Sequence, residues 1–346
     1  MRFSGKRLMV AGLLAAWVGA PAIAQKGYVT PGAAGEITQP SPPITYLWSE
    51  PNDIHAENLF YGRGGKDHEP HGPFIFQSED LDGTNPKFDV RDSSGVKWKI
   101  KLGAEAQPET VASRFLWAIG YHTDEDYFEP MVQVSGLPEH VHRGGDMIEA
   151  GGVMRNVRLK REEGAKKVGN WSWRDNPFVG TREMYGLRVM MAVVNNWDLK
   201  DENNAIRDYK KGDQNGDTRE YLVSDLGASF GTTGRKLSHT KSKGNLGSYE
   251  QSTFIAKERQ NSVDFNVPSR PSLIVAFDAH EYAERMGMRW IGETIPRKDA
   301  RWVGDMLGQL SDDQIRDAFR SGGYSGAELD GFTADFEQRI AELKKL

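Results

Sequence analysis

The sequence predicts an α+β fold in two lobes, a small antiparallel-sheet lobe with one helix and then a larger, mainly helical lobe. Two alternating stretches around the turn "DSSG" predict a β-hairpin over residues 86–103. Apolar residues at helical spacing predict a helix over residues 106–121, and short strands are expected at 131–136 and 154–162. One helix packed on an antiparallel sheet buries an apolar face of each, which favours the two-layer arrangement.

Local signals mark the ends of several helices. Glu109 lies in the first turn of its helix, where the helix dipole favours an acid, and Gly120 follows the end of that helix. Thr181 is a suitable N-cap for the helix that starts after it. In the C-terminal third, which is mainly helical in pattern, Ser311 and Gln314 have the spacing of a capping box.

The composition is that of a globular protein without disulfides. The chain has 346 residues, 38% of them hydrophobic, and includes nine Trp and fifteen Phe, which argues against disorder throughout. It has no cysteine, which excludes a thiol nucleophile, a cysteine-based metal site and the lipid anchor of a bacterial lipoprotein. Its formal net charge of -5 makes it a poor general binder of nucleic acid, so we expect no nucleic-acid partner.

The first 24 residues have the pattern of a secretory signal peptide. A basic start is followed by the apolar run "LMVAGLLAAWVGA" and by the small residues "AIA" that end at Ala24. That run is shorter than the roughly 20 residues of a membrane-spanning helix, so we expect cleavage near Ala24 and no transmembrane segment afterwards. Cleavage would change the net charge from -5 to -8, because three basic residues and no acids are removed. The mature protein is expected to be secreted or periplasmic.

Composition also divides the rest of the chain. Residues 25–80 contain many Pro and Gly residues, which predicts a flexible N-terminal extension. We expect the small lobe to occupy residues 81–165 and the larger lobe residues 166–346, with a charged connector, "REEGAKKVGN", at the boundary.

The stretch "DLKDEN", from Asp198 to Asn203, combines a carboxylate and an amide at a spacing of five residues. An amphipathic helix precedes it, and two strand patterns, "NAIRDY" and "EYLVSD", predict a hairpin after it. The second of these strands ends in the sequence Asp225-Leu226-Gly227. Read alone, "DLKDEN" is a polar turn, but its place in this order favours a functional loop.

The first lobe contains a matching set of residues. Lys101 is the last charged residue of the strand "KWKIKLG", and Glu109 lies in the helix that follows. Upstream, "GTNPKF" places Gly83 and Lys87 in a turn between strands. Lys99 continues the alternating pattern and is the alternative to Lys101, but Lys101 stands directly before the end of the strand.

In this order the motifs resemble those of the protein-kinase-like superfamily over residues 80–300, with a loop pattern similar to its HipA-type and phosphatidylinositol 3-/4-kinase-like branches. The resemblance implies a bilobal protein-kinase-like fold that uses ATP with Mg²⁺ or Mn²⁺. It implies that Lys101 contacts the phosphates, that Glu109 holds Lys101, and that Gly83 and Lys87 cover the phosphates. For the larger lobe, it implies the following roles: Asp198 orients or deprotonates the acceptor hydroxyl, while Asn203 and Asp225 bind the metal ions.

Three departures from the kinase pattern leave an alternative open. The glycine-rich GxGxxGxV loop is absent, Asn196 and Trp197 replace the usual His-Arg pair, and no Ala-Pro-Glu motif follows. ATP is also scarce outside the cytoplasm. The chain is therefore either an exported phosphotransferase acting on a protein, lipid or small molecule, or a catalytically inactive kinase-fold binding module of the cell envelope.

Other chemical signals in the sequence are less specific. The "HEPH" stretch at 68–71 is not HExxH, and its proline opposes the helix that would align two histidines on a metal. "DQNGDT" at 213–218 resembles the start of a calcium loop, but a hairpin turn is the better interpretation. Ser229, in "GASFG", with His239 or His280, is a competing hydrolase hypothesis.

Overall fold

A computed structural model describes residues 44–162, 164–210, 218–231, 242–267 and 279–346, which belong to one compact unit, Pro42–Leu346. The predicted signal peptide, most of the calcium-like loop and His239 lie outside the described residues. No helix in the described part of the chain is long and apolar enough to cross a membrane.

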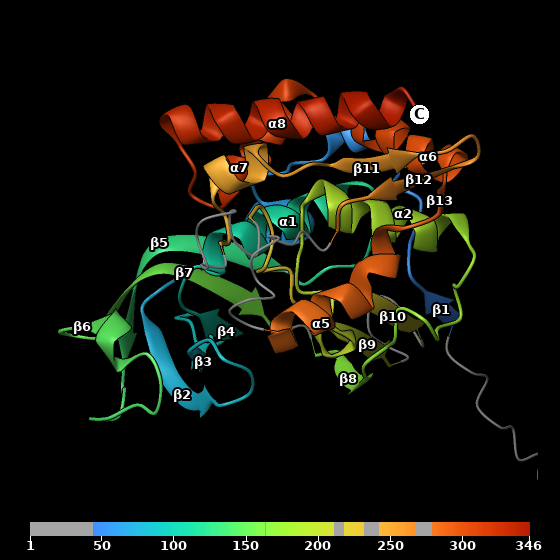
Figure 1. The fold of residues 1–346 in the computed structure, drawn as a ribbon. Helices are drawn as coiled ribbons and strands as arrows, with labels where there is room; N and C mark the ends of the chain where they lie inside the picture. The colour runs from blue at the N-terminus through green and yellow to red at the C-terminus, as the bar shows by residue number, and fades with distance from the viewer. Residues whose placement is uncertain (1–43, 163, 211–217, 232–241, 268–278) are drawn as a thin grey trace, which may run out of the picture. The chain divides into compact units, whose positions relative to one another are not determined.

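The first lobe is built around a closed barrel (Figure 1). The predicted hairpin is confirmed, with Lys87 opposite Lys101 in the register. The expectation of an antiparallel sheet is wrong in one respect, because β2 runs parallel to β5; in addition, β4 pairs with β7, so that five strands close into a barrel. Its strands are β2 (Phe74–Asp80), β3 (Lys87–Arg91), β4 (Lys97–Lys101), β5 (Asp126–Ser135) and β7 (Val153–Arg161), and β6 (Ile148–Glu149) extends the sheet beyond β7.

Alternation along the barrel strands separates an apolar interior from a charged outer face. On β4, Trp98 and Ile100 are buried in the barrel core, whereas Lys99 and Lys101 point to the other face. On β7, Val157 and Leu159 belong to the same core. The lysines and arginines between these apolar positions are therefore available to line a site outside the barrel.

The helix α1 (Ala106–Ala118) packs against β5 and β7 on one side and α7 (Asp312–Ser321) on the other. Its existence was predicted, but it is buried over nearly its whole circumference rather than along one apolar face. This is possible because helices of the second lobe cover it: Phe115 stacks on Phe336 with ring centroids 3.9 Å apart. Gly120 ends the helix with φ of +93°, and a Cβ there would lie 2.1 Å from the Ser49 carbonyl oxygen.

The second lobe combines helices with two further sheets, so it is less purely helical than the sequence suggested. Its four-stranded sheet contains the predicted hairpin of β9 (Asn204–Tyr209) and β10 (Thr218–Val223), which is confirmed as antiparallel. The same sheet contains β8 (Lys166–Gly169) and β1 (Ile44–Tyr46), and β11 (Ile255–Glu258), β12 (Ser262–Phe265) and β13 (Ile295–Pro296) form another. The remaining helices are α2 (Arg182–Val193), α3 (Leu246–Glu250), α5 (Ala279–Met288), α6 (Arg297–Leu307) and α8 (Gly326–Lys344).

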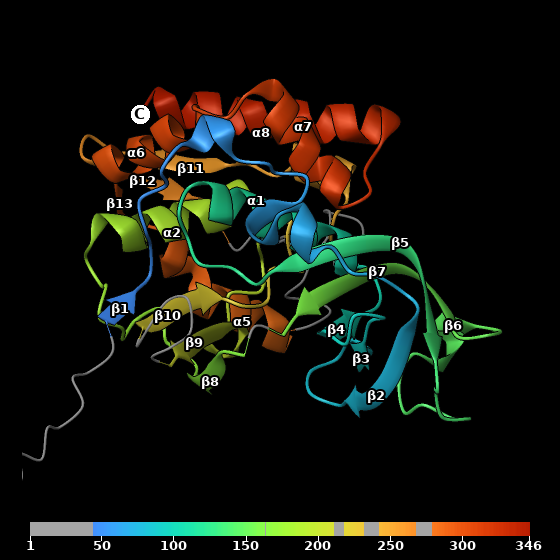
Figure 2. The same cartoon turned by 180° about the vertical axis from the view of Figure 1, so that it is seen from behind.

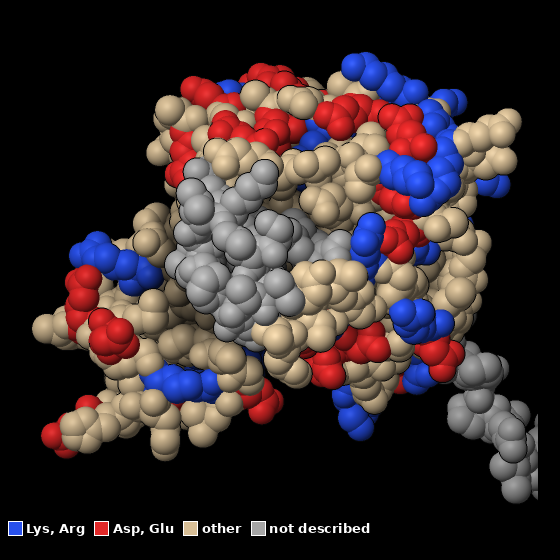
Figure 3. All heavy atoms as spheres, viewed as in Figure 1, with Lys and Arg blue, Asp and Glu red and all other residues tan. Residues whose placement is uncertain are grey.

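Two predicted helix caps are present. Thr181 accepts a hydrogen bond from the Met184 backbone N–H at the start of α2, at 3.1 Å. Ser311 and Gln314 form a reciprocal capping box at the start of α7. The face drawn in Figure 3 shows acidic and basic side chains interspersed, with acidic groups frequent over α7 and α8.

Residues 44–80, which sequence analysis placed in a flexible extension, are instead part of the folded unit. β1 pairs in parallel with β10 (Figure 2), and β2 is a barrel strand. Between them, Ile54, in a short 3₁₀ turn, and Leu59 are buried in the larger apolar core, which also contains residues of α1, α2 and α8. The high Pro and Gly content produces turns here, but the apolar residues between those turns supply enough buried surface to order the segment.

Candidate functional site

A cleft of about 960 Å³ lies outside the barrel. The barrel strands and α1 form one wall, and the loops around Asp198 and Asp225 form the other. All the predicted site residues line this single cleft: Gly83, Lys87, Lys101, Glu109, Asp198, Asn203 and Asp225. The structure thus brings together side chains that are far apart in the sequence.

Lys101, rather than Lys99, lies at the centre of this site. Its ammonium is 2.9 Å from Glu109 Oε2 and 3.2 Å from Asp225 Oδ1. It is also 2.6 Å from Oε2 of Glu105, which sequence analysis did not identify. Lys99 instead pairs with Asp80 and Asp89, at 2.8 and 2.7 Å, on the neighbouring strands. The two lysines share a face of β4 but have different partners.

The three carboxylates keep Lys101 charged. Burial acts to lower the pKa of the Lys101 ammonium, yet Glu109, Asp225 and Glu105 together raise it above its ordinary value. In return, although burial opposes the shift, Lys101 and Lys243 lower the pKa of Glu105 to about 2. Lys101 and Glu105 are therefore held in their charged forms, whereas burial raises the pKa of Glu109 above its ordinary value despite the opposing effect of Arg158 and Lys101.

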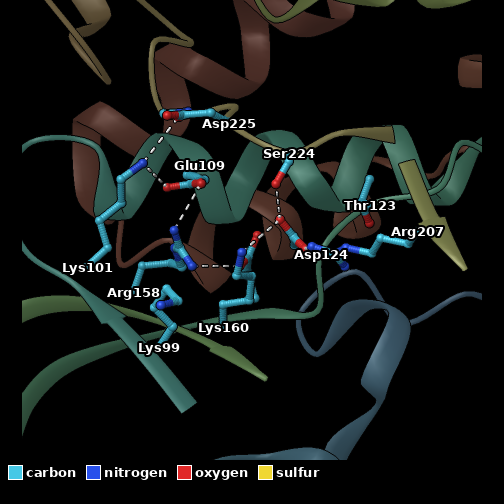
Figure 4. A network of polar contacts seen from close by, with 12 residues as sticks. Lys99, Lys101, Glu109, Thr123, Asp124, Arg158, Lys160, Arg207, Ser224 and Asp225 are labelled. Atoms are coloured by element: carbon cyan, nitrogen blue, oxygen red, sulfur yellow. Dashed lines mark hydrogen bonds and ion pairs between the residues drawn. The ribbon is translucent and has the colours of Figure 1, made fainter. Parts of the chain in front are cut away.

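Glu109 is held from two sides. Its Oε2 contacts Lys101, and Arg158 Nη2 on β7 donates a hydrogen bond to its Oε1 at 3.1 Å. Arg158 also lies 3.4 Å from Asp126, and cross-strand register places it directly opposite Lys101. Figure 4 shows this chain of contacts from Asp225 through Lys101 and Glu109 to Arg158.

The loop that contains Asp198 is tied to the segment before Asp225. The Asn203 side-chain N–H donates to the Asp198 carbonyl at 2.7 Å and closes the loop on itself. The Asn203 carbonyl accepts the backbone N–H groups of Ser224 and Asp225, at 2.8 and 3.1 Å. Asn196, at the position where the kinase pattern has His, accepts the Asp198 N–H through its side chain at 2.9 Å. These bonds explain why the motif residues occur in this order.

Arg285 on α5 is a further site residue that sequence analysis missed. Its guanidinium is fully buried, stacks 4.7 Å from the Trp197 ring centroid, and donates to the Trp197 carbonyl. It also contacts Asp198 Oδ1 at 3.1 Å. Arg285 lies 87 residues after Asp198, and no local pattern links the two, so only the fold reveals the contact.

Gly227 of the Asp-Leu-Gly motif is explained by close packing. A Cβ at this position would lie 2.6 Å from the Glu105 side chain. The Gly227 N–H also donates to Asp225 Oδ1 at 3.2 Å. A glycine therefore allows the Asp225 segment to approach the start of α1 closely.

The donor chemistry fits a divalent cation. Glu105, Glu109 and Asp225 each present a carboxylate oxygen within 4.8 Å of the others, and hard cations prefer such ligands. Lys101 contacts all three carboxylates but carries a single positive charge, and the Asp225 side chain is 41% exposed and reachable from the cleft. Asn203 lines the same cleft, and because its amide nitrogen is engaged, its side-chain oxygen is the atom suited to a metal.

The competing sites receive little support from the described residues. His68 is hydrogen-bonded to Glu125 and Arg161, and neither His68 nor His71 belongs to a candidate metal-binding group there. Ser229 is completely buried, and within the described part of the chain its hydroxyl has no hydrogen-bond partner, a poor arrangement for a nucleophile. His280 lies on α5 and is exposed.

Comparisons with known proteins give a limited result. No family model matches the chain, and no curated protein matches it. Among solved structures, the chain is similar to the proinflammatory kinase CtkA of Helicobacter pylori, at 9% sequence identity and a TM-score of 0.43. The similarity covers 80% of this chain and 98% of that chain. A likeness at this TM-score says nothing about activity, which must be inferred from the cleft itself.

Proposed function

We propose that this protein is an exported phosphotransferase of kinase-like fold that moves a phosphoryl group from ATP to a hydroxyl acceptor. The observation that carries the proposal is the buried Lys101–Glu109 ion pair, which meets Asp225 in the cleft that also contains Asp198 and Asn203. This set combines a fixed cation, metal-binding oxygens and an accessible carboxylate, which are the groups that phosphoryl transfer requires.

Lys101 would position the phosphates. Its ammonium has three N–H donors and contacts Glu105, Glu109 and Asp225, so it would exchange its longest contact, the one to Asp225, to donate to a phosphate oxygen. Gly83, in the turn between β2 and β3, and Lys87, the first residue of β3, line the same wall and would contact the outer phosphates. The Arg143 guanidinium donates hydrogen bonds to the carbonyls of Gly83 and Asp80, which restrains this turn.

Asp225 and Asn203 would hold Mg²⁺ or Mn²⁺ through oxygen atoms. When bound, the ion and the nucleotide supply the transferable group and neutralise its charge. Asp198 lies on the same wall as Asp225, with its side chain 29% exposed, and Arg285 fixes one of its carboxylate oxygens. We assign Asp198 to orient the acceptor hydroxyl and to accept its proton as the oxygen attacks.

The remaining parts of the proposal rest on the sequence. The signal-like first 24 residues support export to the periplasm or the medium, and the lack of cysteine is compatible with an oxidising compartment. The acceptor is a protein, a lipid or a small molecule that carries a hydroxyl group.

Nucleotide binding by the mature protein provides the test. We expect ATP with Mg²⁺ to raise the melting temperature, because a ligand that binds only the folded state stabilises it. Asp225→Asn is expected to abolish the Mg²⁺-dependent part of the increase. Glu202→Gln, an exposed acid of the same cleft outside the proposed metal set, is the matched control and should behave as wild type. An unshifted wild type, or an unchanged Asp225→Asn variant, would contradict the proposal.

A kinase-fold binding module without catalysis is the second candidate. The contact between Lys101 and Glu105 favours this candidate. With Glu105, Glu109 and Asp225 all in contact, the Lys101 ammonium is more completely surrounded by carboxylates than it would be by one glutamate. Such a module would bind a nucleotide or another anionic component of the cell envelope without turnover. Phosphate release distinguishes the two functions, because only the phosphotransferase produces it and depends on Asp198.

A further inference from the structure

A second buried network lies beside the cleft and is centred on Asp124, in the segment between α1 and β5. The Asp124 side chain is 4% exposed, and its Oδ2 accepts a hydrogen bond from the Ser224 hydroxyl at 3.0 Å. Its other oxygen forms an ion pair with Arg207, and Lys160 lies 3.5 Å away. Figure 4 shows Asp124 between Ser224 and Arg207. None of these residues was part of the predicted site.

The partners of Asp124 come from three different parts of the fold. Lys160 is on the barrel strand β7, Arg207 is on β9 of the second lobe, and Ser224 directly precedes Asp225. Although burial opposes the shift, Arg207, Lys160 and Arg158 lower the pKa of Asp124 below its ordinary value. Asp124 is therefore an ionised group that joins the two walls of the cleft at one point.

Ser224 is fixed by bonds at both its backbone and its side chain. Its N–H donates to the Asn203 carbonyl at 2.8 Å, and its hydroxyl donates to Asp124. Among the described residues, the Asp225 carboxylate has two long contacts, both on Oδ1, at 3.2 Å to Lys101 and 3.2 Å to the Gly227 N–H. The direction of the Asp225 side chain thus depends strongly on how the preceding residue is held.

We propose that Asp124 is a positioning residue for the metal-binding carboxylate of Asp225, acting through the Ser224 hydroxyl. The inference rests on the proposed function, because it assigns a task to a residue outside the metal set. Asp124 contacts no part of the nucleotide or acceptor in this account. Its effect is to preorganise the metal ligand, which lowers the reorganisation needed when the ion binds.

The test is the affinity of the mature protein for Mn²⁺ in the presence of a non-hydrolysable ATP analogue, measured by calorimetry. Ser224→Ala removes the hydroxyl bond, and we expect Mn²⁺ to bind roughly 3- to 10-fold more weakly, the effect of losing one buried hydrogen bond. Ser224→Thr retains the hydroxyl and should bind Mn²⁺ within about two-fold of wild type, a difference too small for a lost hydrogen bond.

A second variant separates positioning from stability. Asp124→Asn keeps an oxygen that can accept the Ser224 bond but leaves Arg207 and Lys160 without their carboxylate. We expect it to lower the melting temperature more than Ser224→Ala does, while weakening Mn²⁺ binding less. If Asp124→Asn lowered both the melting temperature and the Mn²⁺ affinity more than Ser224→Ala does, the loss of binding would follow the loss of stability. That result would indicate a merely structural role and would overturn the inference.

The outcomes distinguish this inference from the proposed function. Wild-type protein that binds Mn²⁺ and the nucleotide analogue, with Ser224→Ala unchanged, would overturn the positioning role alone. Equal weakening by Ser224→Ala and Ser224→Thr would also overturn it, since the hydroxyl would then be irrelevant. Wild-type protein that binds neither ligand would overturn the proposed function, and the positioning role with it.

Discussion

The cleft has a buried end, formed by Lys101, Glu105 and Glu109, and an open end, formed by Asp198 and Asn203. The Lys101 and Glu109 side chains are 5% and 2% exposed and come from a strand and a helix, whereas Asp198 is 29% exposed and lies on a loop. The buried end is thus part of the protein's packing, while the open end can meet a second substrate. Substitutions at the buried end should alter folding and binding together, whereas substitution of Asp198 at the open end should alter catalysis alone.

The largest effect on stability is expected from Lys101→Met. Removing the ammonium leaves the buried carboxylates of Glu105 and Glu109 close together beside the partly exposed Asp225, and breaking a buried ion pair in this way costs about 3–5 kcal/mol of unfolding free energy. Urea unfolding of wild type and Lys101→Met measures this loss of unfolding free energy. Lys97→Met, on the same strand but exposed, is the control and should cost less than about 0.5 kcal/mol. Equal losses of unfolding free energy in Lys101→Met and Lys97→Met would show that the buried end of the cleft does not contribute specially to stability.

At the open end, Asp198→Asn should reduce phosphoryl transfer by roughly 10²–10⁴-fold, the usual contribution of a positioned general base. The melting temperature and its increase on adding ATP and Mg²⁺ should remain close to wild type, because Asp198 does not belong to the buried cluster. Steady-state assays and thermal unfolding on the same samples check both expectations. A large loss of nucleotide binding would show that Asp198 acts before the chemical step.

The pH dependence of stability tests the charge state of the buried end. The Glu105 pKa is lowered from 4.5 to about 2 in the folded protein, so its ionised contacts contribute stability above pH 4.5. That contribution is lost as pH falls from 4.5 toward 2. The difference in unfolding free energy between wild type and Glu105→Gln should therefore shrink over this range. A difference that stays constant with pH would mean that Glu105 is not ionised beside Lys101.

The smallest effect is expected far from either end. Ser311→Ala removes the capping box of α7 and should cost about 1 kcal/mol of unfolding free energy. Because this helix cap does not line the cleft, ATP binding should be unchanged when measured well below the melting temperature. An altered affinity for ATP would show that a small loss of stability far from the cleft changes binding in it. Effects of substitutions at the two ends could then not be assigned to those ends alone.

The sequence predicted that Lys101, Glu109, Asp198, Asn203 and Asp225 share one site because the order of their motifs resembles the kinase pattern, and each motif sits at a recognisable boundary. Lys101 ends a strand before a helix, Glu109 opens that helix, and Asp225 follows a hairpin strand. Such local signals depend on residues close together in the sequence. Their functional roles are still proposals, since the structure shows only their proximity.

The contacts that complete the site could not be predicted in the same way. Closure of the barrel depends on pairing between β4 and β7, which are separated by more than 50 residues. Barrel closure brings Arg158 on β7 to Glu109, and the packing of β9 brings Arg207 to Asp124. Arg285, on α5, contacts Asp198. The periodicity of each segment is compatible with these contacts but does not specify partners. Long-range pairing is settled by packing of the whole unit.

The most direct test of the central claim is release of labelled phosphate from γ-labelled ATP by the mature protein, with and without Mg²⁺. Water can replace an unknown acceptor, so the measurement needs no knowledge of the substrate. We expect slow, Mg²⁺-dependent release that Asp225→Asn abolishes. Nucleotide binding without release, whichever metal is supplied, would contradict a phosphotransferase and would favour the binding module.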